Sequence, residues 1–334
     1  MVPTDDPSAY CATLTNWFRE EGEDYPWRQT EDPYSILVSE IMLQQTQVAT
    51  VLGKGYYTRW LELYPDVQAL AEASEDEILR AWEGLGYYRR ARNLQAAAVA
   101  VVERHDGVFP ESTEDILALP GVGRYTAGAV ASFAYGRSEP LVDANVARVF
   151  ARQFDYRERI DTTAGQKQLW GWASEIVTHS QDGRSYNSAL MELGQTHCRN
   201  GEPSCLVCPV RSFCSAEDPT ALPLKGARRE TVEVDEHALL VRKGGSILLE
   251  QGGEGRREGL WKLPEISEDE TVDKKEVLKS KYGITHHRVT LRVYEAEAEY
   301  SPGKESTTRW VEEGDLEDYA LGSPYRKALR KLLE

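Results

Sequence analysis

The sequence lacks long apolar stretches. None of its apolar runs approaches the roughly 20 residues that a helix needs to cross a bilayer. The start, Met1-Val2-Pro3-Thr4-Asp5-Asp6-Pro7, also lacks the basic residues and following apolar run of a secretory signal. A hydrophobic fraction of 41% is nevertheless enough to build cores in a chain of 334 residues. We therefore expect a cytoplasmic protein of about two domains, with no membrane partner.

Basic residues are scarce as well. The chain has 39 Lys and Arg against 55 Asp and Glu, which gives a net charge of -16. This charge lowers the expected non-specific affinity for nucleic acid. It does not exclude a local site for phosphates, because net charge governs long-range steering rather than individual contacts.

The spacing of apolar residues changes along the chain. Over residues 1–220 it is helical, for example after the capping box Ser74-Glu75-Asp76-Glu77. From about Val232 the period moves towards two, and Lys243-Gly244-Gly245 is typical of a β-hairpin turn. The predicted order is an all-α domain, a linker and a smaller α+β domain, over residues 1–220, 221–232 and 233–334.

Cysteine is rare, with five residues, but four of them are close together. Cys198, Cys205, Cys208 and Cys214 form a C-x6-C-x2-C-x5-C pattern. In a cytoplasmic chain this pattern favours a metal site over disulfides. The spacing alone leaves three alternatives open: an iron–sulfur cluster, zinc, or reduced cysteines without metal. The remaining cysteine, Cys11, is expected to be a buried helix residue.

The segment Leu119-Pro120-Gly121-Val122-Gly123-Arg124 predicts a tight turn between two helices. Proline ends the first helix, and Gly121 and Gly123 let the backbone turn closely. The amides at the start of the next helix then face outward, where the helix dipole favours an anion such as a DNA phosphate. The alternative is a helix–helix turn with no ligand.

Two carboxylates are candidates for chemistry. Glu40 lies between apolar residues, and partial burial there would raise its pKa towards that of a general acid. Asp143 follows an apolar run and opens a helix, which is also the pattern of an ordinary N-cap. Each residue alone is a weak signal, since Glu40 could equally be a surface residue of an amphipathic helix.

Together these motifs resemble the helix-hairpin-helix, Gly/Pro-Asp superfamily of base-excision DNA glycosylases, and within it the adenine DNA glycosylases of the MutY family. The resemblance runs from about Trp17 to Cys214, with a weaker extension to Tyr294. The segments that carry it, besides the hairpin and the four cysteines, are Pro26-Trp27-Arg28, Ser39–Gln47, Gly84–Asn93 and Val142–Val146. It implies a helical glycosylase domain with a 4Fe–4S cluster bound by the loop of residues 198–214.

The activity implied by the resemblance is removal of adenine mispaired with 8-oxoguanine or guanine, leaving an abasic site. Such chemistry requires the base to be flipped out of the duplex. Glu40 would protonate adenine N7 and then assist the incoming water. Asp143 would stabilise the oxocarbenium-like sugar or trap it covalently, as in retaining glycosidases. Tyr125 and Asn145 would orient these groups.

Tyr125 also predicts the subclass. Related bifunctional enzymes such as endonuclease III have a lysine at this hairpin position, whose amine forms a Schiff base during strand cleavage. A tyrosine cannot form that imine. We therefore expect a monofunctional enzyme.

The resemblance also implies contacts with DNA. The adenine pocket is expected to be lined by Trp27, Arg28 and Leu43. Residues that enter the base stack or support the orphaned partner are expected to be Gln45, Leu85 and Tyr88, with Thr46 also in contact. Phosphate contacts are expected at Gly121 and Gly123.

The C-terminal domain is expected to be Nudix-like and to recognise 8-oxoguanine. In this family a Phe-Ser-His loop reads the lesion, and Ile284-Thr285-His286 stands in its place. Thr285 keeps the hydroxyl and His286 keeps the ring, whereas Ile284 loses the aromatic face. The alternative is a polar β-hairpin turn without this role.

The partner implied is double-stranded DNA containing A·8-oxoguanine or A·G mispairs. The family also suggests a monomer, a nucleoid-associated protein of prokaryotic type, and contacts with a sliding clamp or an abasic endonuclease. None of these follows from the residues themselves.

Three other functions are open to this sequence. A thymine glycosylase acting on G·T mismatches would share the tyrosine and the cysteines, but has no use for Thr285 and His286. A non-catalytic sensor of DNA damage would gain nothing from burying both Glu40 and Asp143. A Nudix hydrolase is disfavoured because the segment after Gly259–Pro264 lacks the acidic metal-binding helix.

Overall fold

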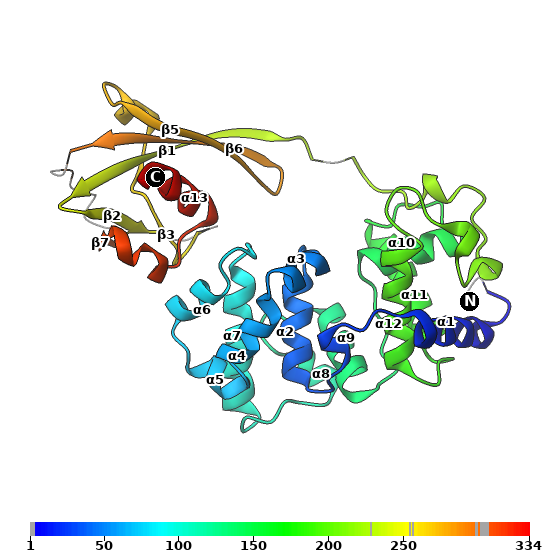
Figure 1. Cartoon of the computed structure of the whole chain (residues 1–334). Helices are drawn as coiled ribbons and strands as arrows, with labels where there is room; N and C mark the ends of the chain where they lie inside the picture. The colour runs from blue at the N-terminus through cyan, green and yellow to red at the C-terminus, as the bar shows by residue number, and fades with distance from the viewer. Residues whose placement is uncertain (1–3, 228, 254, 256, 298–299, 301–306) are drawn as a thin grey trace. The chain divides into compact units, whose positions relative to one another are not determined.

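The computed structural model describes residues 4–227, 229–253, 255, 257–297, 300 and 307–334. The chain divides into two compact units (Figure 1). The first consists of Met1–Val48, Leu61–Gln68 and Ala96–Ala227, and the second of Ala49–Trp60, Ala69–Gln95 and Arg228–Glu334. Within the described ranges, no helix is both long and apolar enough to cross a membrane.

The two units are not divided where the secondary structure changes. Helices continue as far as Ala221 and the first strand begins at Val232. Two helical segments before residue 220, Ala49–Trp60 and Ala69–Gln95, nevertheless group with the strands. The domain limits predicted from the sequence follow the change of secondary structure and stay predictions.

The first unit is built from helices. They are α1 (Pro7–Glu21), η1 (Pro26–Arg28), α2 (Pro33–Leu43), α8 (Thr113–Leu117), α9 (Arg124–Tyr135), α10 (Ala144–Gln153), α11 (Thr163–Val177), α12 (Gly183–Thr196), η2 (Cys205–Val207), η3 (Arg211–Phe213) and η4 (Pro219–Ala221). Four further helices run across the division between the units: α3 (Val48–Gly53), α4 (Tyr56–Leu63), α5 (Val67–Glu72) and α7 (Arg89–Arg104).

Helix α10 contributes most of one face to the core of the first unit. Its residues Val146, Val149 and Phe150 are fully buried and belong to one cluster with apolar residues of α1, α11 and α12. Asp143 caps the helix, accepting a 2.7 Å hydrogen bond from the backbone N–H of Val146. Because the apolar face is buried, the helix and its capping carboxylate are held in place.

Helices α8 and α9 form the predicted hairpin. Gly121 has a φ of +72°, and α9 begins directly after Gly123. Leu119 and Val122 of the intervening turn are buried. A residue with a side chain would be strained at position 121, because this left-handed backbone conformation favours glycine.

The helical part of the second unit includes α6 (Glu75–Ala81), which begins with the predicted capping box. The backbone N–H of Glu77 donates to the Ser74 hydroxyl at 3.3 Å, and the Glu77 carboxylate accepts from the backbone N–H of Ser74 at 2.8 Å. The prediction from the sequence is confirmed at this helix.

The remainder of the second unit is a seven-stranded sheet with a C-terminal helix, which confirms a sheet-containing C-terminal part. The strands are β1 (Val232–Lys243), β2 (Ser246–Gln251), β3 (Trp261–Lys262), β4 (Glu265–Ile266), β5 (Glu276–Ile284), β6 (His287–Ala296) and β7 (Thr308–Glu312), and the short helices are η5 (Glu268–Thr271) and η6 (Glu313–Asp318). The strand order is β3-β2-β1-β6-β5, with β4 paired to β1 and β7 to β2. Strands β1 and β6 are parallel, and the other pairs are antiparallel.

Helix α13 (Ser323–Leu333) packs on one face of this sheet. Its buried residues Tyr325, Ala328 and Leu329 recur at the spacing of one helix face, as in an amphipathic helix. They share a core with sheet residues such as Leu240 and Val293. This packing fixes the position of the first turn of α13.

Candidate active site

A cavity lies beside Glu40 in the first unit. Trp27, Arg28 and Leu43, the residues expected from the sequence to line an adenine pocket, all line it. The structure therefore brings three residues from η1 and α2 to one cavity with the candidate acid.

Glu40 is held inside α2 and is only 5% exposed. The helix is apolar on nearly every side, with Ile36, Leu37 and Ile41 also buried, so its one carboxylate has little contact with water. Burial raises the pKa of Glu40 to about 7; the nearby charge of Asp143 adds to the rise, while the Tyr125 hydroxyl and Arg28 oppose it. A carboxyl with this pKa can both donate and accept a proton near neutral pH.

Tyr125 lies in the first turn of α9. Its hydroxyl interacts with the Glu40 carboxylate and is 3.6 Å from the sulfur of Met191. Burial, with the charges of Glu40 and Asp143, raises the pKa of Tyr125 well above its ordinary value. The phenol is therefore neutral and can orient Glu40 through a hydrogen bond.

Asp143 is both an N-cap and a neighbour of Glu40. Its second oxygen accepts a 3.0 Å hydrogen bond from the side-chain amide of Asn145. Burial raises the pKa of Asp143, and the hydrogen bonds from Val146 and Asn145 oppose this rise. These bonds favour the ionised form, so the two carboxylates are placed in different environments.

Asn145 is itself fixed by Arg148. The Asn145 side-chain oxygen accepts a 2.9 Å hydrogen bond from Arg148, which also donates to the backbone carbonyls of Gly194 at 2.7 Å and Cys198 at 2.8 Å. A Cβ at Gly194 would lie 2.8 Å from the Asn145 Cβ. The close approach of α12 to α10 therefore requires glycine at 194 and holds Asn145 against Asp143.

Arg28 is oriented by an ion pair. One Arg28 nitrogen lies 2.7 Å from an oxygen of Glu192, whose side chain is 1% exposed. The guanidinium also lies over the ring of Tyr25, at 4.6 Å from the centroid. Since both charges are shielded from water, the pair fixes the position of Arg28 at the wall of the cavity.

The hairpin leaves the start of α9 without a side-chain cap. Gly123 occupies the N-cap position and no side chain accepts from the first-turn amides there. Gly123 has a φ of -96°, and a Cβ at this position would meet nothing within 4 Å. Its lack of a side chain is therefore not required by the fold, whereas it would let an anion approach the amides closely.

The four predicted cysteine ligands line a second cavity. Burial raises the pKa of Cys208 to about 11 and also raises that of Cys214. Backbone N–H groups of Val210 and Ala216 interact with these two sulfurs. Across the described ranges, no group of three or more His, Cys, Asp or Glu side chains is arranged to hold a single metal ion.

The comparisons with known proteins agree with this geometry. Residues 38–175 match the family model described as HhH-GPD superfamily base excision DNA repair protein. An adenine DNA glycosylase of Mycolicibacterium smegmatis is 40% identical over 202 residues, covering 60% of this chain and 67% of that protein. The chain belongs to the HhH-GPD superfamily.

Two further relatives extend the comparison of this HhH-GPD protein. The adenine DNA glycosylase of Homo sapiens is 45% identical over 218 residues, which cover 63% of this chain but 39% of the human protein. A solved structure of a thermostable thymine-DNA glycosylase is 30% identical, with a TM-score of 0.56, and covers 63% of this chain and 95% of that one. The chain thus spans less than half of the human relative.

In this HhH-GPD chain the residues expected to enter the base stack differ in their exposure. Leu85 and Tyr88 are both only 7% exposed, and their contact with DNA stays a prediction. Tyr87 is instead 45% exposed, with a φ of +48°. The sequence offered two adjacent tyrosines, and only the backbone conformation distinguishes them. Gln45, also with a positive φ of +59°, is exposed, and Thr46 is half-buried.

The predicted lesion-reading residues form a turn. Thr285 and His286 connect β5 and β6, where Ile284 pairs with His287. Thr285 has a φ of +55°, and its hydroxyl lies 2.7 Å from the Ile284 carbonyl. The alternative read from the sequence, a polar β-hairpin turn, is thus the observed geometry, and the role in lesion recognition stays a prediction.

Sequence reasoning missed the contribution of α12 to the cavity. Ser188, Met191 and Gln195 of this helix, together with Arg184, line its wall. Their spacing of three and four residues marks one helix face. That signal shows that the residues lie together, but not that they face Glu40, which is about 150 residues away in the sequence.

Proposed function

We propose that this chain is a monofunctional adenine DNA glycosylase of base excision repair, acting on adenine paired with 8-oxoguanine or guanine. The curated relatives are adenine DNA glycosylases. The observation that carries the proposal is the buried Glu40 carboxyl, which lines the cavity and has a pKa of about 7. The charge of Asp143 lies close enough to raise that pKa.

The first step requires a proton on the base. A flipped adenine enters the cavity, where Trp27 and Arg28 line the wall. The protonated form of Glu40 donates to N7, so that the base leaves as a neutral molecule. The Tyr125 hydroxyl orients the carboxyl through its hydrogen bond.

The second step requires an anion near the sugar. As the glycosidic bond breaks, positive charge develops on the deoxyribose, and ionised Asp143 stabilises it. Glu40, now ionised, accepts a proton from the water that attacks the sugar. Asn145 keeps Asp143 in position by donating to its second oxygen.

Tyr125 limits the enzyme to base removal. A phenol cannot form the imine by which a lysine amine cleaves the strand. After reaction, borohydride should therefore fail to trap an enzyme–DNA crosslink. Efficient trapping would contradict the monofunctional assignment.

The cysteine loop fits a 4Fe–4S cluster. Four thiols from residues 198–214 surround one cavity, and backbone amides interact with two of the sulfurs. Burial disfavours free thiolates, so these groups need a metal centre to deprotonate them. When bound, the cluster would supply four metal–thiolate bonds that fold the loop around Cys198, whose carbonyl accepts from Arg148.

We further propose that the C-terminal part is a Nudix-like reader of 8-oxoguanine. Thr285 and His286 supply a hydroxyl and an imidazole at the exposed β5–β6 turn. We assign the residue that enters the base stack to Tyr87, since its ring is exposed. Double-stranded DNA is the partner, with a phosphate held at the uncapped start of α9 after Gly121 and Gly123.

One assay tests the activity. The protein is incubated with duplexes that contain a single A·8-oxoguanine, A·G or T·G pair, and abasic sites are then cleaved with alkali. We expect cleavage at the adenine of the first two duplexes, and Glu40→Gln should abolish it while duplex binding is retained. Absence of product from both adenine duplexes would overturn the proposal.

A thymine glycosylase acting on T·G pairs is the second candidate. It is favoured by the thermostable thymine-DNA glycosylase, which this chain matches over 95% of its length. The T·G duplex in the same assay separates the two functions. Product from that duplex alone would make thymine removal the activity.

A further inference from the structure

The loop between α6 and α7 needs support from outside itself. Gly84, Gly86 and Tyr87 all have positive φ, of +94°, +70° and +48°. Such a backbone is unfavourable for Tyr87 and is not reinforced by a regular hydrogen-bond ladder. From within the helical part, Trp82 and Arg90 each donate to the Gly86 carbonyl at 3.1 Å. Backbone bonds also tie the loop to its flanking helices, from Leu85 N–H to the Trp82 carbonyl at 3.2 Å and from Arg90 N–H to the Tyr87 carbonyl at 2.9 Å. Two further contacts come from the C-terminal part.

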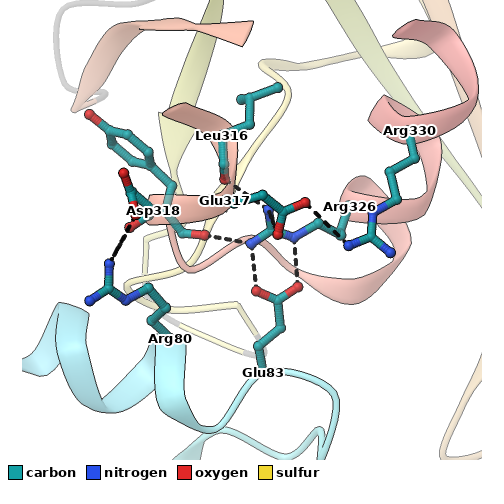
Figure 2. Close-up of polar contacts among 8 residues, drawn as sticks. Arg80, Glu83, Leu316, Glu317, Asp318, Arg326 and Arg330 are labelled. Atoms are coloured by element: carbon teal, nitrogen blue, oxygen red, sulfur yellow. Dashed lines mark hydrogen bonds and ion pairs between the residues drawn. The ribbon is translucent and has the colours of Figure 1, made fainter. Parts of the chain in front are cut away.

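The first end is held by helix α13 of the C-terminal part (Figure 2). Arg326 binds the Glu83 carboxylate with two hydrogen bonds, Nε to Oε1 at 2.7 Å and Nη2 to Oε2 at 2.5 Å. The Arg326 side chain is 7% exposed and that of Glu83 is 23% exposed. A bidentate pair with so little access to water is geometrically specific and weakly screened.

Arg326 is rigid because its own domain also holds it. It donates to the carbonyls of Leu316 and Tyr319, both at 2.8 Å, and pairs with Glu317 at 3.2 Å. Figure 2 shows these groups converging on one guanidinium. The ion pair therefore ties Glu83 to a fixed point of the C-terminal part rather than to a mobile side chain.

The second end lies close to the same helix. Tyr88 is 7% exposed, and Ser323, at the start of α13, lies beside its hydroxyl. Glu83 and Tyr88 flank the four residues that include exposed Tyr87. The first turns of α13 thus contact both ends of a segment whose only strongly exposed ring is that of Tyr87.

We propose that Glu83 and Arg326 are positioning residues that present Tyr87 to the DNA base stack. This proposal rests on the proposed glycosylase function. If these residues position Tyr87, the C-terminal part, which carries Thr285 and His286, also sets the geometry of the loop between α6 and α7 that opens the duplex. Base extrusion therefore depends on the C-terminal part even though Glu40 and Asp143 lie elsewhere.

The main test uses the full chain with Glu83→Gln, which keeps the shape of the side chain but removes its charge. We expect the backbone amides of residues 84–88 to exchange with deuterium at least about tenfold faster, because the ion pair no longer restrains the loop. This measurement needs no DNA and no activity. It therefore tests the positioning even if the protein proves not to be an adenine glycosylase.

The functional readout is extrusion of the target base. On a duplex with 2-aminopurine opposite 8-oxoguanine, Glu83→Gln should give a smaller rise in fluorescence than the wild type. On the corresponding adenine duplex, it should excise the base about tenfold more slowly in a single turnover. The pH dependence of excision should stay that of the wild type, because the Glu40 site is unchanged. Glu83→Asp, which keeps the charge, should recover part of the rate.

The chain offers a matched control. Arg80 and Asp318 also join α6 to the C-terminal part, at 3.4 Å, but their side chains are 47% and 74% exposed (Figure 2). Asp318→Asn removes the same charge at an exposed pair, so exchange and excision should match the wild type. If Glu83→Gln also matches the wild type in exchange and extrusion, the proposal is wrong.

A double substitution completes the test and guards against unfolding. Arg326→Gln also removes the hydrogen bonds to the carbonyls of Leu316 and Tyr319. Comparing its melting temperature with that of Glu83→Gln therefore shows whether it lowers the stability of the fold as well. The pair Glu83→Gln and Arg326→Gln should slow excision no more than the worse single variant. Multiplied effects of the two substitutions would show independent roles and overturn the proposal.

Discussion

The raised pKa of Glu40 predicts that replacing this residue by glutamine stabilises the folded protein, and that the gain depends on pH. Burial raises the pKa of this carboxyl from its ordinary value of 4.5 to about 7. Below pH 4.5 the group is neutral in both the folded and the unfolded chain, and its pKa shift has no effect on stability. Between pH 4.5 and 7 the unfolded chain ionises first, so the folded state loses stability as the pH rises.

Above pH 7 the loss is complete, at about 3 kcal/mol, since a tenfold change in proton affinity corresponds to about 1.4 kcal/mol. Glu40→Gln removes this cost while keeping a similar side-chain shape. We expect the variant to gain about 3 kcal/mol at pH 8, and less than about 1 kcal/mol at pH 5. For a unit of this size the gain at pH 8 corresponds to about 5–10 °C in melting temperature.

The assay is thermal unfolding of both proteins at pH 5 and pH 8, followed by circular dichroism. Glu103→Gln, which removes the same charge from an exposed position of α7, is the control and should change the melting temperature little at either pH. Equal gains for Glu40→Gln at both pH values, or a gain no larger than that of the control, would refute the argument from burial.

Three further predictions concern catalysis. The single-turnover excision rate should fall above about pH 7, as Glu40 loses its proton, and fall again in acid as Asp143 is protonated; a rate that still rises at pH 9 would contradict these roles. Arg148→Gln removes the donors that fix Asn145, so excision should slow about tenfold with little change in duplex affinity, and an unchanged rate would contradict this. Thr285→Ala with His286→Ala should lower the ratio of excision rates for A·8-oxoguanine and A·G duplexes, measured side by side; an unaltered ratio would place lesion recognition elsewhere.

Local sequence patterns predicted where Glu40 and Asp143 lie because each pattern reflects a local physical cause. The apolar residues around Glu40 dictate its burial wherever α2 packs. For Asp143 the sequence offered an N-cap and a catalytic carboxylate as competing interpretations, and the structure shows the cap geometry next to Glu40. One oxygen accepts the capping bond from Val146, and the other accepts from Asn145. Local reasoning could not reveal that one carboxylate can make the capping bond and also lie near Glu40.

Contacts between distant segments could not be predicted. Arg28 and Glu192 are 164 residues apart, and neither has a neighbour in the sequence that indicates the other. The same is true of Glu83 and Arg326, and of the parallel pairing of β1 with β6. These features depend on how whole elements pack, which a periodicity of two or four residues does not encode.

The uncapped start of α9 has a consequence for binding in concentrated salt. Affinity for DNA falls with ionic strength largely because cationic side chains release the counterions condensed on phosphates. The backbone amides after Gly123 can hold an anion without relying on the charge of a side chain. We therefore expect the proposed phosphate contact at this helix start to weaken less with added salt than a contact made by a charged side chain.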